Sequence, residues 1–290
     1  SVSRRLRRGH RARDIRKAVH REHGSESILV LLHSYRDAAE ATKTVFDVFE
    51  RANSPLRLTV AIRQESRPGD SDTWALYSRV AGRHSAGSFQ DRIRVVNARA
   101  EHSPGPLAGV LDLFKQVDRG ERFVLVVSPG VTVCDGWDLE LLDFHSDASR
   151  QTGRPEFTLL SQVPELVGGA PRPSSSGRSG VSGGVSAVVS GMLSMARATT
   201  QGSRPSVTSR ATYTRLDATY RVPSVVSAAF PHPQQRPRRI TSVSTGLVFC
   251  PGALLRALGP SPEVPQYAAD VVLSSMLHAA GGVFFAPPAT

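Results

Sequence analysis

Cysteine is scarce in this sequence, and long hydrophobic runs are missing. The two cysteines, Cys134 and Cys250, lie far apart without CxxC spacing. This excludes a cysteine zinc site, argues against a disulfide framework and favours a reducing compartment. The longest purely aliphatic or aromatic runs have about five residues, as in Phe123–Val127. The sequence therefore predicts neither a transmembrane helix nor a secretory signal core.

Motifs of common nucleotide and metal sites are also missing. The sequence has no GxGxxG and no GxxxxGK[ST] loop, which excludes the dinucleotide fingerprint and the P-loop. Its nine histidines have neither HxxxH nor HExxH spacing, so no zinc-peptidase helix is expected. We expect most of these histidines to be surface or hydrogen-bonded residues.

Positive charge is abundant and unevenly spread. The formal net charge is +11, and residues 1–24 hold eight Arg and one Lys against Asp14 and Glu22, which accounts for about seven of those charges. Such an arm contacts nucleic acid, an anionic membrane surface or an acidic protein, or else it is a solvated tail. We expect RNA, bound through phosphates and without sequence reading, because the arm lacks interleaved aromatic residues. The RNA-contacting residues are then Arg4, Arg5, Arg7, Arg8, Arg11, Arg13, Arg16 and Lys17.

The first residues, SVSRRLRRGHRAR, resemble an organelle transit sequence or the end left after its cleavage. This composition favours a mitochondrial location, with the cytoplasm as the alternative. No membrane partner is expected.

Apolar spacing predicts an α/β fold. Residues 27–35 are a continuous apolar run typical of a buried strand, 37–52 have helical spacing behind Asp37 as cap, and 56–64 alternate like a second strand. Together they form a β-α-β unit, followed by a loop-rich stretch. Further strands are predicted at 92–98, 122–130, 155–163, from 244 and at the C-terminus, and helices at 106–120 (closed by Gly120), 137–149, before 258 and at 267–282.

Composition divides the chain into four parts. A basic arm (1–26) precedes the nucleotide-side half of the domain (27–167). Sixteen of the 24 residues from Gly168 to Gly191 are Gly, Ser or Pro, which predicts a flexible insertion over 168–204. The acceptor-side half follows at 205–290.

Two short motifs carry a resemblance to a known family. SYRD (34–37) follows the first strand, and GWD (136–138) follows the most hydrophobic strand. In this order they resemble the GT-A glycosyltransferases, specifically the polypeptide α-N-acetylglucosaminyltransferases that include the Skp1 hydroxyproline GlcNAc-transferase. The resemblance covers roughly residues 27–165 and 205–288. It implies a Rossmann-like GT-A mixed sheet flanked by helices.

The resemblance also implies a UDP-sugar donor and a Mn²⁺ or Mg²⁺ ion, which neutralises the leaving diphosphate. The family supplies metal ligands from a D-x-D or D-x-H turn after the central strand. Here that turn reads Ser128-Pro129-Gly130, which lacks the carboxylates that hard cations prefer. Asp135 and Asp138 lie beyond the turn, and we expect them to cap the next helix.

Other parts of the family mechanism are missing as well. The acidic G-E-E motif corresponds to Ala268-Ala269-Asp270, in which Asp270 is either a surviving catalytic acid or a first-turn helix residue. Residues 103–114 contain no Lys or Arg for a phosphate, and related enzymes continue past the position of Thr290 to a metal-binding histidine. Together these departures predict a pseudoenzyme without a metal.

The nucleotide edge of the family pattern is retained. Ser34, Tyr35, Arg36 and Asp37 match the uridine-side motif, where Tyr35 could stack on the base and Asp37 accept its N–H. Alternatively, Asp37 caps the helix and Tyr35 packs at the end of the sheet. Weak UDP-sugar binding without catalysis is compatible with either arrangement.

Two main hypotheses follow. The first is a catalytically inactive glycosyltransferase-like subunit of a larger assembly, such as the ribonucleoprotein of a divergent mitochondrial ribosome. The second is an active UDP-sugar-dependent polypeptide GlcNAc-transferase acting on Ser, Thr or hydroxyproline, with Asp270 as its acid and Mn²⁺ or Mg²⁺ as cofactor. A UDP-sugar sensor without turnover is a third alternative.

Overall fold

The computed structural model describes residues 26–81, 85–162, 165–166, 187–188, 210–216, 223–229, 236–259, 264 and 268–287. The predicted RNA-contacting residues of the arm lie outside this range, as does nearly all of the predicted insertion. Among the residues described, no helix combines the length and the apolar character needed to cross a membrane.

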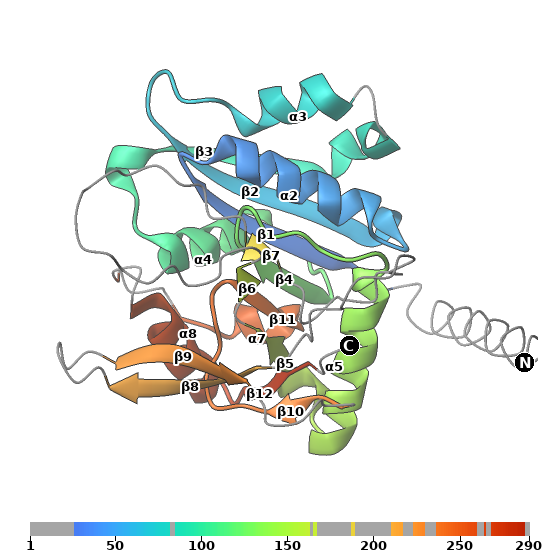
Figure 1. The fold of residues 1–290 in the computed structure, drawn as a ribbon, viewed down its shortest axis with the longest axis vertical. Coiled ribbons are helices and arrows are strands. Elements are labelled where there is room, and N and C mark those ends of the chain that lie inside the picture. The colour runs from blue at the N-terminus through green and yellow to red at the C-terminus, as the bar shows by residue number, and fades with distance from the viewer. Residues whose placement is uncertain are drawn as a thin grey trace, which may run out of the picture.

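An eight-stranded sheet forms the centre of the molecule (Figure 1). Its strand order is β10-β12-β5-β11-β4-β1-β2-β3. Strand β1 (Ile28–Tyr35) pairs in parallel with β2 (Leu58–Ser66) on one side and β4 (Phe123–Val127) on the other. Strand β3 (Ile93–Arg99) extends β2 in parallel at the sheet edge. Chain order therefore reverses between β1 and β4, as in Rossmann-like folds.

The other half of the sheet is mixed. Strand β11 (Leu247–Pro251) runs antiparallel between β4 and β5 (Thr158–Ser161). Beyond β5, β12 (Val283–Ala286) is parallel to it and β10 (Arg238–Arg239) is antiparallel to β12. The predicted mixed sheet is confirmed. Because β11 is reversed, the turn preceding it reaches the carboxyl end of β4, where Ser128 N donates to Gly246 O over 3.2 Å.

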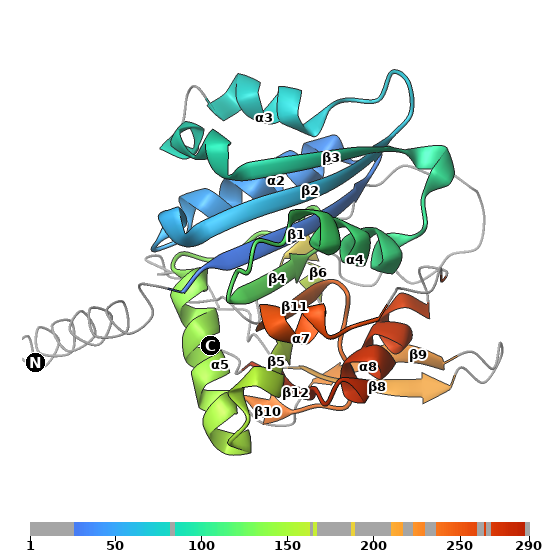
Figure 2. The same ribbon diagram turned by 180° about the vertical axis from the view of Figure 1, so that it is seen from behind.

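Helices cover both faces of the sheet (Figures 1 and 2). Alternate residues of β1 point into separate cores, Val30 and Leu32 into one and Leu29 and Leu31 into the other. The helices of the first core are α2 (Ala38–Glu50), α3 (Thr73–Ala81) and α5 (Trp137–Thr152); those of the second are α4 (Pro106–Val117), α7 (Gly252–Arg256) and α8 (Ala269–Ala279).

Short elements complete the described fold. Two further two-stranded antiparallel pairs and four 3₁₀ turns are present. They are β6 (Glu165–Leu166) with β7 (Ala187–Val188), β8 (Arg210–Leu216) with β9 (Pro223–Ala229), and η1 (Pro55–Arg57), η2 (Ser85–Arg92), η3 (Ala100–His102) and η4 (Pro155–Phe157).

Two local predictions are wrong. Helix α3 lies in the stretch predicted to be a loop; it is short, and Asp72 caps it by accepting a 2.7 Å hydrogen bond from Ala75 N. Helix α4 ends at Val117 with Asp118 in an extended conformation, so Gly120 lies beyond its cap. Asp37 stands at the N-cap position of α2, where the sequence predicted the helix cap.

The GWD motif joins α5 to the end of α2. Gly136 adopts a left-handed φ of 80° and donates its N–H to Arg51 O over 2.6 Å, and the Trp137 indole donates to Val48 O over 3.0 Å. The sequence predicted that Asp138 caps α5, and this is wrong. Its carboxylate instead accepts the backbone N–H groups of the α2–β2 loop. Asp135 is 84% exposed and lies 3.5 Å from Arg51. The motif thereby ties the start of α5 to the end of α2 and to the loop that follows it.

Candidate functional site

The carboxyl ends of β1 and β4 form the switch point of the sheet. In open α/β sheets, ligands bind in the crevice at this position, because the connections on either side turn in opposite directions. Here three polar residues meet beside the crevice: His33 from β1, Ser128 after β4 and Thr245 before β11.

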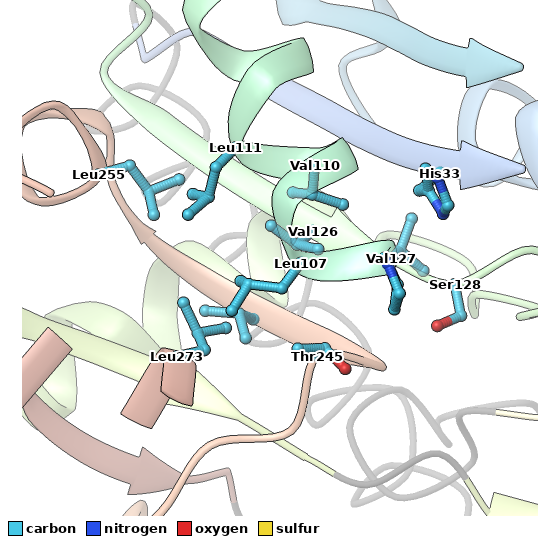
Figure 3. Close-up of a pocket in the computed structure, with 12 residues that line it drawn as sticks. His33, Leu107, Val110, Leu111, Val126, Val127, Ser128, Thr245, Leu255 and Leu273 are labelled. Atoms are coloured by element: carbon cyan, nitrogen blue, oxygen red, sulfur yellow. The ribbon is translucent and has the colours of Figure 1, made fainter. Parts of the chain in front are cut away.

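A cavity of about 90 Å³ opens beside these residues. It lies between the sheet and the helices of the second core, and Figure 3 shows its aliphatic side chains converging from α4, β4, α7 and α8. The apolar lining residues are Pro106, Leu107, Val110, Leu111, Val126, Val127, Val248, Leu255 and Leu273.

His33 is the titratable group of this cavity. Its side chain is 9% exposed, and its Nε2 lies 3.1 Å from Oε1 of the fully buried Glu65. Arg63 donates to the same oxygen over 2.7 Å. Burial lowers the pKa of His33, and this outweighs the opposing effect of Glu65. Burial alone would raise the pKa of Glu65, but hydrogen bonds from Ser103, Arg63 and His33 outweigh burial and lower it.

Gly109 of α4 sets the position of the imidazole. A Cβ atom at this residue would lie 2.5 Å from Cδ2 and 2.7 Å from Nε2 of His33. The helix therefore packs its backbone directly against the ring, a distance that requires glycine. This contact and the Glu65 carboxylate hold His33 at the cavity.

The predicted nucleotide-side residues point in different directions. Ser34 is fully buried, and its Oγ has no hydrogen-bond partner. Tyr35 is 47% exposed, so it does not pack at the sheet end. Arg36 has a positive φ of 56° and forms a two-pronged ion pair with Asp70, at 2.9 and 3.1 Å. Partial burial, followed by the charge of Glu40, raises the pKa of Asp37. None of these four predicted residues lines the described cavity.

The turn after β4 does not fit a divalent cation. Ser128, Pro129 and Gly130 supply no carboxylate, and Gly130 N donates to Glu40 O over 3.4 Å. Across the described ranges, no group of three or more His, Cys, Asp or Glu side chains is placed to hold a metal ion.

Asp270 is engaged in a local hydrogen-bond pair. Its Oδ1 accepts both the backbone N–H and the hydroxyl of Thr245, each over 2.6 Å. The carboxylate thus fixes the turn before β11 and orients Thr245 at the cavity. Asp270 also lies in the first turn of α8, the position that the structural alternative gave it.

Sequence reasoning missed His33, Arg63 and Glu65. His33 immediately precedes the SYRD motif, but it lies on the opposite face of β1 from Ser34. The contacts of His33 with Arg63 and Glu65 of β2 depend on the parallel register of the two strands. In this register His33 is opposite Arg63, and Tyr35 is opposite Glu65. The spacing of histidines along the chain gives no signal of this.

The solved structures that resemble this chain share little sequence with it. No protein-family model and no curated protein matches the chain. Among solved structures, S. aureus TarS 1-349 is 12% identical with a TM-score of 0.45, over 90% of this chain and 57% of that chain. The mannosyltransferase PcManGT from Pyrobaculum calidifontis, solved with GDP-Man and Mn²⁺, is 13% identical with a TM-score of 0.34, over 48% and 36%. Glucosyl-3-phosphoglycerate synthase from Mycobacterium tuberculosis is 9% identical with a TM-score of 0.33, over 51% and 47%.

Each of these matches covers less than two thirds of the known protein. At these identities and TM-scores, they identify neither the family nor the activity of the chain. The polypeptide GlcNAc-transferase resemblance stays a prediction.

Proposed function

We propose that the chain is a catalytically inactive domain of the GT-A type, serving as a structural and binding subunit of a larger RNA-containing assembly. A divergent mitochondrial ribosome is the kind of particle that its composition fits. In this proposal the Arg-rich arm contacts RNA phosphates, and the folded domain supplies protein contacts.

The observation that carries this proposal is the engagement of the nearby carboxylates. Sugar transfer from a nucleotide diphosphate needs charge to be neutralised where the leaving group departs. The carboxyl end of β4 instead opens onto an aliphatic cavity. Of the acids that come closest in the family pattern, Asp138 and Asp270 accept backbone N–H groups within the fold, and Asp135 is exposed and paired with Arg51. These structural hydrogen bonds are sufficient for a scaffold role, which needs no catalytic carboxylate.

The charge distribution supports RNA as the partner. Residues 1–24 carry nine basic side chains and two acidic ones, a surplus of seven out of the net +11. Arginine presents a planar fork that binds phosphate through two hydrogen bonds, and each neutralised phosphate releases counterions. Binding should therefore weaken steeply as salt rises.

Sedimentation of the full-length tagged chain tests the assembly. The intact chain should travel with a large particle that ribonuclease disperses. Replacing the eight predicted arm residues, Arg4 to Lys17, by Gln should release it. A matched variant with Arg236, Arg238 and Arg239 replaced by Gln removes exposed charge from the folded domain, and it should stay on the particle. Sedimentation of the intact chain as a free, salt-indifferent monomer would contradict the proposal.

Calorimetric titration with UDP-GlcNAc, with and without Mn²⁺, tests the loss of chemistry. We expect no Mn²⁺-dependent binding and no transfer to Ser, Thr or hydroxyproline peptides. Mn²⁺-dependent binding, together with transfer that Asp270→Asn abolishes, would establish the active GlcNAc-transferase instead. Metal-independent binding without turnover would indicate a UDP-sugar sensor.

A further inference from the structure

The cavity at the switch point has the size and lining of a small-ligand site. Its walls are aliphatic side chains, and its volume is about 90 Å³. An apolar cavity of roughly 150 Å³ accepts benzene and stays free of water. In proportion, the smaller volume suits an aliphatic body of about three or four heavy atoms.

The polar end of the cavity presents two hydrogen-bond acceptors, from His33 and Thr245, beside the Ser128 hydroxyl, which can both donate and accept. Nε2 of His33 faces the Glu65 carboxylate at 3.1 Å, so the neutral imidazole carries its proton there and Nδ1 becomes the acceptor. Arg63 binds the same carboxylate and helps to keep it ionised. The Thr245 hydroxyl donates its proton to Asp270, which leaves its oxygen lone pairs as acceptors.

The lining also selects against charged ligands. No Lys, Arg, Asp or Glu is among the residues that line the cavity. An ammonium group would enter without a counter-ion. A carboxylate would meet the acceptors of His33 and Thr245 with only the Ser128 hydroxyl to donate to it, so both charged groups would lose hydration with little compensation. A neutral donor avoids this cost.

We propose that this cavity binds a small neutral ligand with a branched aliphatic body and one hydrogen-bond-donating group, such as a short alcohol. The aliphatic body occupies the space beside Val110 and Leu255. The donor binds His33 Nδ1 or Thr245 Oγ1. The proposed ligand site involves neither the basic arm nor a nucleotide. Its binding test is therefore independent of the test of the scaffold function.

Ligand-observed NMR on the full chain tests the proposal with four compounds of nearly equal shape. These are 2-methyl-1-propanol, 2-methylbutane, isobutylamine and isobutyrate. The alcohol should bind about tenfold more tightly than the alkane, since one hydrogen bond distinguishes them. The two charged compounds should bind more weakly still. No binding of the alcohol, or equal binding of alcohol and alkane, would overturn the proposal.

Variants localise the binding. Val110→Phe should fill the cavity and abolish alcohol binding, and Leu255→Phe should do the same from another helix. Val117→Phe is the control: Val117 is buried and lies on the same helix, α4, but it does not line the cavity. This variant should bind the alcohol within about twofold of the original affinity. Melting curves identify any variant that is unfolded. Unchanged binding in both folded filling variants would place the ligand elsewhere.

Two substitutions of His33 separate its hydrogen bond from its bulk. His33→Asn keeps an acceptor near the position of Nδ1, whereas His33→Leu has none. The first should retain the preference for alcohol over alkane, and the second should reduce it to about threefold or less. An unchanged preference in His33→Leu would exclude the imidazole as the acceptor.

Discussion

The carboxylate of Asp138 accepts a 2.7 Å hydrogen bond from the backbone N–H of Asn53, 85 positions earlier in the chain. Its second oxygen accepts the N–H of Ser54 over 3.0 Å and lies 3.5 Å from Nε of Arg57. The Asp138 side chain is fully buried, and that of Arg57 is 4% exposed. The start of α5 is therefore tied to the loop between α2 and β2.

Asp138→Ala should lower the free energy of unfolding by about 3–5 kcal/mol. The substitution leaves two backbone N–H groups without their acceptor and removes the nearer of the two carboxylates, Asp138 and Glu26, that act on the buried Arg57 guanidinium. Urea denaturation followed by circular dichroism measures the change.

Asp135→Ala provides the matched control three positions earlier. Asp135 is 84% exposed, and its pair with Arg51 spans 3.5 Å. Its substitution should change stability by no more than about 0.5 kcal/mol. Equal losses in the two variants would mean that the buried carboxylate contributes nothing beyond its surface neighbour.

Much of the fold could be predicted because buried parallel strands have a distinct pattern. The run of residues 28–32 is apolar throughout because both faces of β1 are covered, and each face belongs to a separate core. Helices α2, α4 and α8 follow from apolar residues at helical spacing. Helix α3 was missed because it is short and only three of its nine residues are buried.

The site could be predicted only in part, because it depends on register and on which face each residue occupies. The family motif directs attention to Ser34, Tyr35, Arg36 and Asp37, whereas the preceding residue, His33, lines the cavity. Pairing of His33 with Glu65 requires knowledge of how β1 aligns with β2. The absence of acidic residues from the turn after β4 could be predicted from the sequence alone, since it depends only on which residues stand there.

Gly109→Ala should destabilise the protein by about 1–3 kcal/mol. Alanine normally favours a helix over glycine by about 0.5–1 kcal/mol, but here its Cβ would lie 2.5 Å from the His33 ring. Thermal unfolding measures the loss. Gly259→Ala is the control, because nothing lies within 4 Å of its added Cβ. Combining Gly109→Ala with His33→Ala should cost less than the two single losses added together, because the clash disappears.

Acidification should weaken the fold through His33. The pKa of His33 is lowered in the folded state relative to its ordinary value of 6.5, so the unfolded chain takes up a proton first. This stabilising contribution is fully present above pH 6.5 and is lost as pH falls from there toward the lowered pKa, with a slope of at most about 1.4 kcal/mol per pH unit.

Urea midpoints at pH 7.5 and 5.5 measure this dependence. His33→Asn removes the titrating group and should show a smaller fall between the two pH values. Glu65 acts in another window: its pKa is lowered from 4.5, so the stability it provides is lost only as pH falls below that value. An identical fall in the original protein and in His33→Asn would assign the effect to other groups.

Substitutions of Asp270 test whether its hydrogen bonds or its negative charge stabilise the turn before β11. Asp270→Asn retains an oxygen that can accept both hydrogen bonds from Thr245, so it should cost no more than about 1 kcal/mol. Asp270→Ala removes both bonds and should cost about 2 kcal/mol, with faster hydrogen exchange at the Thr245 N–H. Urea denaturation and exchange measured by mass spectrometry report the two effects. If Asn were as destabilising as Ala, the negative charge rather than the hydrogen-bond geometry would be what the turn requires, and a cationic partner for Asp270 would have to be sought.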